Sequence, residues 1–185
     1  MSPPTGRLLC ASRNNPDQIF RDLGVPTTFL LTSFYWDNLI YFGLGPKRGP
    51  DGKLGITLPM DGKRLPGIAA EDIGKCAYGI FKRGRELIGK TVAIAGEHLS
   101  GAEMAAALSR ALGQEVRYKA VPPEVFRGFG FPGADELGNM FQFKRDFNDM
   151  YCANRPLDLS RSLNPELQSL DEWMAANVSR VPIEG

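Results

Sequence analysis

Apolar residues recur at helical spacing over residues 71–82, and this segment predicts the clearest helix of the chain. Positions i, i+3, i+4, i+7 and i+8 carry apolar side chains, which form a single stripe on one face of such a helix: Ile73, Cys76, Ala77, Ile80 and Phe81. We expect these five side chains to pack against the core, which leaves Tyr78 and Lys82 on the opposite edge.

Capping signals mark further helices. Residues 15–17, Asn-Pro-Asp, are typical of a helix start, and Gly24 ends the helix that they predict. Ser100 and Glu103 form a capping box. The helix that it opens ends at Gly113, and its inward face carries Met104, Leu108 and Ala111. Less regular patterns predict three more helices, over residues 123–128, 135–150 and 166–177.

Runs of β-branched and apolar residues predict strands, over residues 27–32, 54–59, 91–95 and 115–120. The first is expected to be buried on both faces and both edges of a parallel sheet. The fourth alternates strictly, so its inward face is Val116, Tyr118 and Ala120. The third and fourth strands, with the capped helix between them, predict a βαβ unit of parallel neighbours with a right-handed connection.

The composition is that of one globular domain. The chain has 185 residues, of which 43% are hydrophobic and 23% charged. Its 22 Lys and Arg against 21 Asp and Glu leave a net charge of +1, which gives no general attraction to nucleic acid or anionic lipid. No apolar run reaches the roughly 18 residues that a membrane helix needs, and no signal-peptide stretch opens the chain. We expect a cytoplasmic or nuclear protein that binds neither nucleic acid nor membrane.

Cysteine and histidine are too scarce for a metal centre. Cys10, Cys76 and Cys152 lie far apart without a CxxC pair, so neither a disulfide framework nor a zinc knuckle is expected. His98 is the single histidine, which excludes a multi-histidine metal site. It falls in a predicted strand-to-helix loop, a favoured place for site residues in α/β folds, although a solvated loop residue is the simpler interpretation.

Two motifs stand in a context that does not favour their chemistry. The GxGxxG run over residues 128–133 follows a predicted helix rather than a strand, and Pro132 lacks the N–H that a pyrophosphate would need. We interpret it as a turn. Tyr78 and Lys82 have the YxxxK spacing of short-chain dehydrogenases, in which the ammonium lowers the pKa of the phenol. Since they lie away from the predicted core, we interpret them as an amphipathic edge.

Residues 33–40, Ser-Phe-Tyr-Trp-Asp-Asn-Leu-Ile, are the strongest candidate for a binding site. They follow the carboxyl end of a predicted buried strand, where ligands sit in open α/β sheets. Aromatic rings offer flat apolar surface to a planar group, and Asn38 offers both a donor and an acceptor. The alternative is a hydrophobic loop packed on the sheet.

This segment and four others, in one colinear order over residues 15–178, resemble the NmrA-like family: Leu23–Thr28, Asp72–Gly74, Phe131–Ala134 and Asn139–Phe141. These proteins are atypical short-chain dehydrogenase relatives, which use a Rossmann domain as an NAD(P)-dependent sensor or regulator. The resemblance implies that the helix over 135–150 closes over the cofactor cleft. It also implies contacts with the nicotinamide side of NADP or NAD from Tyr35, Trp36, Asp37 and Asn38.

The resemblance implies an α/β fold: the C-terminal part of a Rossmann-like NmrA-type fold, with the smaller substrate-side lobe and with the N-terminal dinucleotide-binding half missing. Family members begin with a strand, a Gly-rich phosphate loop and a helix, and this pattern does not open the present sequence. The family usually carries a lysine near the start of a later helix, the one that residues 15–24 match, and seven residues before Phe20 this chain has Arg13. We divide the chain into an irregular arm (1–14), the NmrA-like region (15–178) and a tail (179–185).

Three functions stay open. The first is an NAD(P)-associated regulatory or redox-sensing protein without turnover, which is truncated for cofactor binding and has no catalytic residue or metal. The second is an NAD(P)H-dependent reductase of a small carbonyl or quinone. The third is a protein-interaction module without a cofactor. Because the N-terminal half that we expect to be missing would supply the neighbours of the first strand on one side, we also expect self-association through the edge left open.

Overall fold

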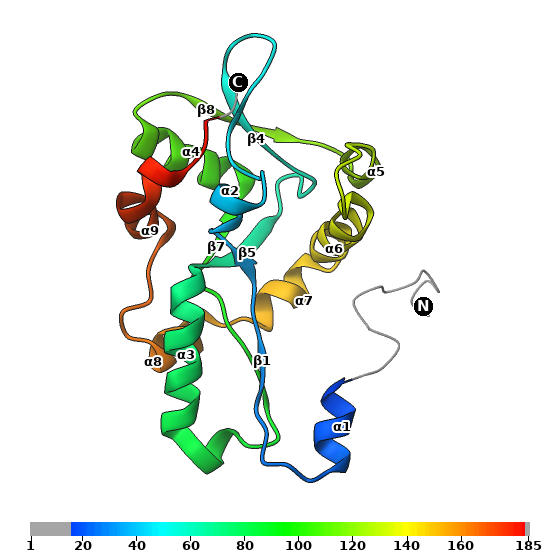
Figure 1. Ribbon diagram of the computed structural model, residues 1–185, viewed down its shortest axis with the longest axis vertical. Helices are drawn as coiled ribbons and strands as arrows, with labels where there is room; N and C mark the ends of the chain where they lie inside the picture. The colour runs from blue at the N-terminus through cyan, green and yellow to red at the C-terminus, as the bar shows by residue number, and fades with distance from the viewer. Residues whose placement is uncertain (1–15, 184–185) are drawn as a thin grey trace.

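The fold, seen in a computed structural model that describes residues 16–183, mixes helices with three small sheets (Figure 1). The helices are α1 (Pro16–Asp22), α2 (Asn38–Tyr41), α3 (Ala70–Arg83), α4 (Gly101–Leu112), α5 (Pro123–Arg127), α6 (Ala134–Asp146), α7 (Asn148–Ala153), α8 (Leu157–Leu163) and α9 (Leu170–Asn177). The strands are β1 (Phe29–Leu31), β2 (Phe34–Tyr35), β3 (Lys47–Arg48), β4 (Leu54–Leu58), β5 (Arg64–Ile68), β6 (Thr91–Ala93), β7 (Glu97–Ser100) and β8 (Val116–Ala120). The predicted arm (1–14), Asn15 and the last two residues of the predicted tail lie outside the described residues.

Each sheet joins segments that are distant in the sequence. β1 pairs with β6 in parallel, with Leu30 opposite Val92. β5 pairs with β2 in parallel and with β7 in antiparallel fashion. β4 pairs with β3 in antiparallel fashion and with β8 in parallel, with Ile56 opposite Tyr118.

The predicted βαβ unit is wrong, because β6 and β8 belong to different sheets. After β6 the chain enters β7, which bonds to β5, so α4 links β7 rather than β6 to β8. The helix itself is confirmed: Ser100 and Glu103 form both capping-box bonds, and Gly113 ends the helix at φ 65°. The inward face predicted for the last strand holds for Val116 but not for Ala120, which is exposed.

The apolar run of β1 is typical of a strand buried on both faces and both edges, and the expected loss of its neighbours on one side predicts an open edge in this chain. Phe29 is 8% exposed, but Leu31 is 45% exposed. Within residues 16–183, β6 is its only pairing partner. One edge of β1 therefore lies open in the part of the chain that the structure describes.

The buried face of α3 differs from the predicted apolar stripe. Cys76 and Ile80 are buried as expected, whereas Phe81 is 82% exposed and Asp72 and Gly79 are buried instead. The cause is α8, a helix that the sequence pattern does not predict. It packs against α3 and turns the buried face towards Asp72 and Gly79.

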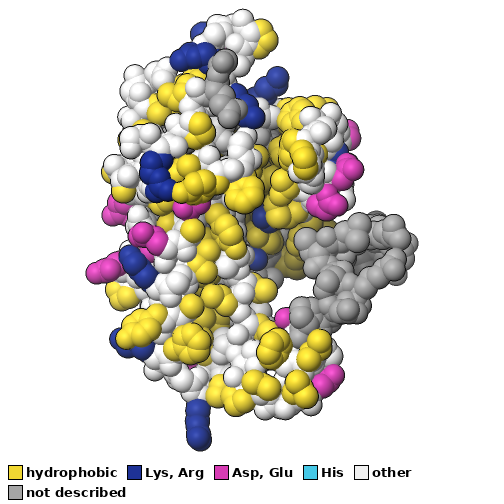
Figure 2. All heavy atoms as spheres, in the orientation of Figure 1, with side chains coloured by type: hydrophobic (Ala, Val, Ile, Leu, Met, Phe, Trp, Pro, Cys, Tyr) yellow, Lys and Arg dark blue, Asp and Glu magenta, His cyan; other side chains and the backbone are white. Residues whose placement is uncertain are grey.

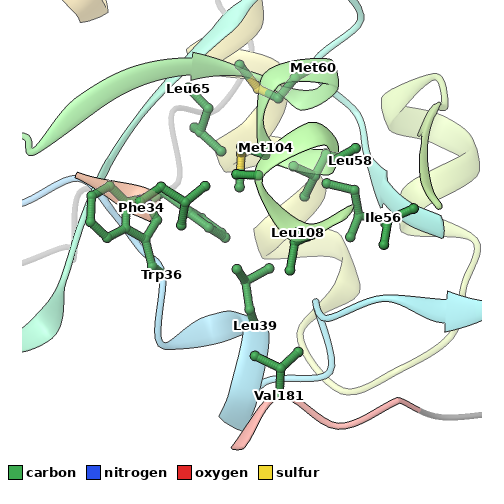
Figure 3. Close-up of a cluster of buried hydrophobic side chains, with 14 of the residues drawn as sticks. Phe34, Trp36, Leu39, Ile56, Leu58, Met60, Leu65, Met104, Leu108 and Val181 are labelled. Carbon is green, nitrogen blue, oxygen red and sulfur yellow. The ribbon is translucent and has the colours of Figure 1, made fainter. Parts of the chain in front are cut away.

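The main core lies between β4, β5, β8 and α4. Figure 3 shows its central side chains converging from these elements and from the segment around α2: Phe34, Trp36, Leu39, Ile56, Leu58, Met60, Leu65, Met104 and Leu108. A second cluster lies under α3 and includes Cys76, Ile80 and Val92. The region predicted as one helix over 135–150 is two helices, α6 and α7, which meet at Phe147.

No helix in the described range has both the length and the apolar character needed to cross a membrane. The same residues contain no group of three or more His, Cys, Asp or Glu side chains arranged to hold a metal ion.

Candidate site at the carboxyl end of strand β1

Arg155, just beyond α7, joins the carboxyl end of β1 to the α6–α7 arm. Its Nε and Nη2 atoms donate to the Thr32 carbonyl at 3.4 and 3.2 Å, and Nη1 donates to the Tyr151 carbonyl at 3.2 Å. Thr32 follows β1 directly. The side chain thus connects two segments that are more than a hundred residues apart.

Arg155 is a buried cation without an acidic partner in the part of the chain that the structure describes. It is 8% exposed, and it forms no salt bridge with any residue of the described range. The carbon at the centre of its guanidinium lies 3.7 Å from the centroid of the Tyr151 ring. Burial lowers the pKa of Arg155 from its usual value, since desolvation disfavours the charged form. The carbonyls and the aromatic face replace part of the lost hydration.

Lys144 brings a second cation to the same aromatic ring. Its Nζ atom lies 5.5 Å from the Tyr151 centroid and 5.7 Å from that of Phe141, and Lys144 is only 6% exposed. Asn148 fixes the corner between α6 and α7, because its Nδ2 donates to the carbonyls of Arg64, at 2.6 Å, and Lys144, at 3.0 Å. Two buried positive charges therefore lie near the Tyr151 ring.

Ser33 and its neighbours complete this region. The Ser33 hydroxyl is buried, and no group among residues 16–183 forms a hydrogen bond with it. Thr32 Oγ1 and the Tyr35 hydroxyl lie 2.9 Å apart. Buried hydroxyls are normally satisfied, so the Ser33 hydroxyl takes its partner from outside the described residues.

The four predicted cofactor residues have different surroundings. Tyr35 is 37% exposed and bonds to Thr32. Trp36 is buried in the core, 6.4 Å from Trp173 between ring centroids. Asp37 accepts a hydrogen bond from the Ala70 amide at the start of α3, and half-buried Asn38 begins α2. Of the four, Tyr35 is the one that the structure brings to Thr32; their role in cofactor binding stays a prediction.

His98 lies in β7, not in a loop as expected, and it is half-buried rather than solvated. Its Nε2 lies 3.0 Å from the Arg155 carbonyl. Burial lowers the pKa of His98, and the nearby charges of Arg64 and Arg155 act in the same direction. The neutral imidazole donates to this carbonyl, so His98 helps to hold the backbone that carries Arg155.

The YxxxK pair and the GxGxxG run both lie where the sequence analysis expects no catalytic or cofactor-binding role. Tyr78 is 65% exposed on α3, with Lys82 Nζ 5.6 Å from its ring centroid, on the outer edge as predicted. The GxGxxG run lies between α5 and α6, where Gly130 and Gly133 adopt φ values of 72° and 83°. These positive values suit glycine, and the interpretation as a turn is confirmed.

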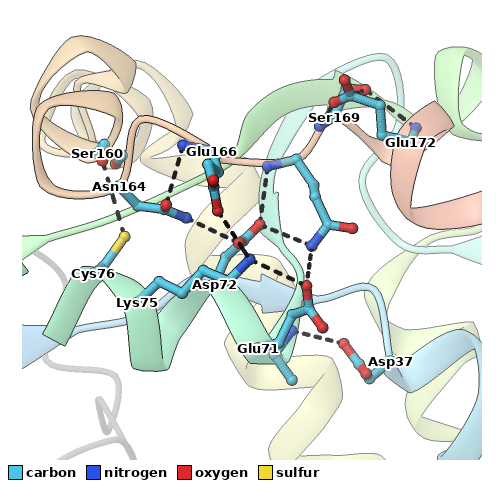
Figure 4. A network of polar contacts seen from close by, with 12 residues as sticks. Asp37, Glu71, Asp72, Lys75, Cys76, Ser160, Asn164, Glu166, Ser169 and Glu172 are labelled. Carbon is cyan, nitrogen blue, oxygen red and sulfur yellow. Dashed lines mark hydrogen bonds and ion pairs between the residues drawn. The ribbon is translucent and has the colours of Figure 1, made fainter. Parts of the chain in front are cut away.

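The Asp72–Ile73–Gly74 motif serves the fold. The Asp72 carboxylate has no exposed surface, and it accepts hydrogen bonds from Asn164 Nδ2 at 2.9 Å and from the Gln168 amide at 3.0 Å. Lys75 lies 3.7 Å away on the same helix. Figure 4 shows how this network ties α3 to the segment between α8 and α9.

Sequence analysis missed Lys144, Tyr151 and Arg155. The available signal is their spacing: Lys144 and Tyr151 are seven residues apart, and Arg155 follows Tyr151 by four, which would put all three near one face of a continuous helix. Cations beside an aromatic residue on an inward face are unusual. The predicted single helix over 135–150 ended too early to reveal this spacing.

Comparisons with known proteins agree with this fold. The model of the NmrA-like family matches residues 15–176. The nitrogen metabolite repression protein nmr of Neurospora crassa is 34% identical over 124 residues, covering 63% of this chain and 25% of that protein. The nitrogen metabolite repression protein nmrA of Emericella nidulans is 37% identical over 108 residues, covering 55% of this chain and 31% of that protein.

Among solved structures, NmrA, a negative transcriptional regulator, in complex with NADP is similar. It is 25% identical, with a TM-score of 0.67, and the match covers 87% of this chain and 55% of that chain. The fold is therefore that of the NmrA-type Rossmann-like proteins. The chain belongs to the NmrA-like family. It spans about half the length of the solved NmrA chain and a third or less of the two curated relatives.

Proposed function

We propose that this chain is an NAD(P)-associated regulatory protein of the redox-sensing kind, which binds the nicotinamide side of the cofactor at the carboxyl end of β1 and does not turn it over. The observation that carries the proposal is the match to NADP-bound NmrA over 87% of the chain. The names of the two fungal relatives, both nitrogen metabolite repression proteins, support a regulatory role in the cytoplasm or nucleus.

The position of the site supports the nicotinamide side. In open α/β sheets ligands bind beyond the carboxyl ends of parallel strands, and β1 pairs in parallel with β6. Thr32, Ser33 and Tyr35 lie directly at that end. A pyrophosphate is held by a Gly-rich turn between a strand and a helix, and residues 16–183 contain no such turn. We therefore expect weak binding of NADP by this chain alone, because the described residues offer no such turn to the phosphates.

A nuclear magnetic resonance titration tests the proposal. Millimolar NADP⁺ should shift the amide signals of residues 32–38 and 144–155, whereas 2′-phospho-ADP-ribose, which lacks nicotinamide, should not. Tyr35→Ala should reduce the shifts, and Tyr78→Ala, which removes an exposed tyrosine from the outer edge of α3, should leave them unchanged. If NADP⁺ shifts no signal in these segments, the proposal fails and the cofactor-free interaction module takes its place.

Absence of turnover has its own test. With NADPH and a panel of quinones, the absorbance of NADPH should stay constant. Should residual oxidation occur, Tyr78→Phe is expected to change its rate by less than a few-fold, since Tyr78 lies away from the site. A loss of about 10²-fold, the usual effect of removing a general acid, would restore the YxxxK interpretation.

One observation favours the second candidate, an NAD(P)H-dependent reductase of a small carbonyl or quinone. The Tyr151 ring lies 5.5 Å from Lys144 Nζ, next to Arg155. Tyrosine is one of the side chains that can act as a general acid in such a reduction. If a carbonyl substrate is reduced, Tyr151→Phe should lower the rate about 10²-fold, whereas Tyr78→Phe should not.

A further inference from the structure

We propose that the outer face of α3 and of the segment that follows it, here named the α3 face, is a docking site for an acidic amphipathic helix of a partner protein. The face consists of the exposed apolar and cationic side chains of residues 78–90: Tyr78, Phe81, Lys82, Arg85, Ile88 and Lys90. The inference goes beyond the proposed function, because none of these residues belongs to the site at the carboxyl end of β1.

The α3 face exposes apolar side chains that proteins normally bury. Phe81 is 82% exposed, and Tyr78, one turn earlier on α3, is 65% exposed. The packing of α3 on α8 accounts for their position, because it turns Asp72 and Gly79 inward and leaves Phe81 facing outward. Large apolar groups that lie together on a surface mark interaction sites, and aromatic residues are enriched in protein interfaces.

The shape of the face suits a second helix. Tyr78 and Phe81 are three residues apart, so their rings are neighbours on the helix surface. Gly74, one turn before Tyr78, faces open space and leaves the helix surface beside that ring uncovered. A partner helix can therefore lie along α3 and place its apolar side chains around the two rings.

The charges of the face fit an acidic partner. Residues 78–90 contain four Lys and Arg and a single acid, Glu86, which lies 3.9 Å from Arg83. Three cations of the face form no salt bridge with any residue of the described range: Lys82, Arg85 and Lys90. The Lys82 ammonium instead lies 5.6 Å from the centroid of the Tyr78 ring. A partner carboxylate at Lys82 thus lies beside the apolar contact at Tyr78.

Rings and cations occur together on this face. Figure 2 shows hydrophobic side chains and Lys or Arg atoms side by side over the lower half of α3. The C-terminal end of a helix attracts cations by itself, but that attraction does not account for the exposed rings next to them. A helix that carries leucines on one side and carboxylates beside them covers the rings and pairs with the cations.

A protein partner fits the face better than nucleic acid or lipid does. The chain carries a net charge of only +1, whereas nucleic acid and anionic membranes attract strongly basic surfaces. Single-stranded nucleic acid also needs cations along a groove. Here the three cations without a salt bridge lie in the last turn of α3 and beyond it. One end of an acidic helix is enough to pair with them.

Fluorescence anisotropy with the full chain tests the inference. The probe is a labelled synthetic helix of about 20 residues, with leucine on one face and glutamate on the other. It should bind about tenfold more tightly than a peptide with lysine in place of glutamate, and than one with alanine in place of leucine. Failure of the acidic peptide to bind, or equal binding of the lysine peptide, would overturn the inference.

Variants assign the binding to the α3 face. Phe81→Ala and Arg85→Glu should each weaken the acidic peptide about tenfold. Phe42→Ala and Lys119→Glu make the same changes at exposed positions outside the face and should leave the affinity unchanged. Because all four side chains are exposed, the melting temperatures should stay close to that of the unmodified chain. Equal losses of affinity in the face variants and the controls would contradict the assignment.

Other occupants of the face give different results. A thymidine oligonucleotide or phosphatidylserine vesicles could bind more tightly than the acidic peptide and lose that binding with Arg85→Glu, which would assign the face to nucleic acid or to lipid. Self-association that Phe81→Ala abolishes would assign it to a second copy of this chain. Each of these results would overturn the acidic helix as the partner.

Discussion

At the residue scale, Asp72 is a fully buried carboxylate. It accepts hydrogen bonds from Asn164 and Gln168, which are more than 90 residues away, and lies close to Lys75 on its own helix. Asp72→Asn places an amide group against the Asn164 and Gln168 donors. We expect it to lower the free energy of unfolding by about 3 kcal/mol, the cost of breaking a buried charged contact. Glu71→Gln, the exposed neighbour that also bonds Gln168, should cost less than about 1 kcal/mol. Urea denaturation compares the two, and similar losses would contradict the role of burial.

His98 links stability to pH. Burial lowers its pKa in the folded state, so in the unfolded chain it takes up a proton at a higher pH than in the folded one. Stability therefore falls as pH drops below about 6.5, the ordinary pKa of histidine. Carboxylates with lowered pKa values, such as Glu103, contribute only at more acidic pH. Urea denaturation at pH 7.5 and 5.5 should show a smaller pH effect in His98→Gln, and an equal effect would refute this assignment.

Single residues also show why the predicted cofactor segment was hard to interpret. An aromatic run after a strand is compatible with a ligand surface or with a core. The structure packs the Trp36 ring next to Trp173 and against Gly67. A residue larger than glycine at position 67 would collide with the Trp36 ring. It uses Asp37 to bond the start of α3. These partners are 30 or more residues away, so local sequence does not reveal them.

At the scale of elements, the packing of α3 on α8 depends on a close approach at Gly79. A side-chain carbon there would collide with the Leu163 backbone, whereas Gly74 on the same helix faces open space. Gly79→Ala should lower the free energy of unfolding by about 2 kcal/mol through overpacking. Gly74→Ala should raise it by roughly 0.5–1 kcal/mol, because alanine favours helix. Thermal and urea unfolding measure both, and a stabilising Gly79→Ala would show that the helices do not meet as described.

The open edge of β1 predicts self-association. Apolar side chains gather over α1, the turn after it and β1 (Figure 2): Ile19, Phe20, Leu23, Val25 and Leu31. An unpaired strand edge with exposed apolar groups is a template for a second chain. Sedimentation velocity should show concentration-dependent association, which Leu31→Lys reduces. Phe42→Lys, at an exposed site after α2, should not reduce it. A wild-type chain that sediments as a clean monomer at high concentration would exclude this edge as an interface.

Elements with strong local signals were predictable, and those that depend on distant partners were not. The capping box at Ser100 and Gly113 define α4, and the periodic segment 71–82 lies within α3. By contrast, α8 carries no clear apolar stripe and forms against α3, so its burial of Gly79 was missed. Strand pairing was also unpredictable, since a segment such as β8 gives no local sign that its neighbour is β4.

At the scale of the whole molecule, the site is assembled from three regions: the carboxyl end of β1, the α6–α7 arm and β7. Thr32, Arg155 and His98 link them through hydrogen bonds. The family resemblance implies cofactor contacts from residues 35–38, and the structure adds Arg155, whose guanidinium donates to the nearby Thr32 carbonyl. Arg155 lies just beyond α7, whereas Thr32, whose carbonyl accepts its hydrogen bonds, is more than a hundred residues earlier.

The central claim is that this chain contacts the nicotinamide end of the dinucleotide. Saturation-transfer nuclear magnetic resonance of NADP⁺ with the intact chain tests it most directly, because each ligand proton reports its own closeness to the protein. We predict that the nicotinamide ring protons receive clearly more saturation than the adenine protons, at millimolar ligand. Equal or greater saturation of the adenine protons, or none at either end, would contradict the account.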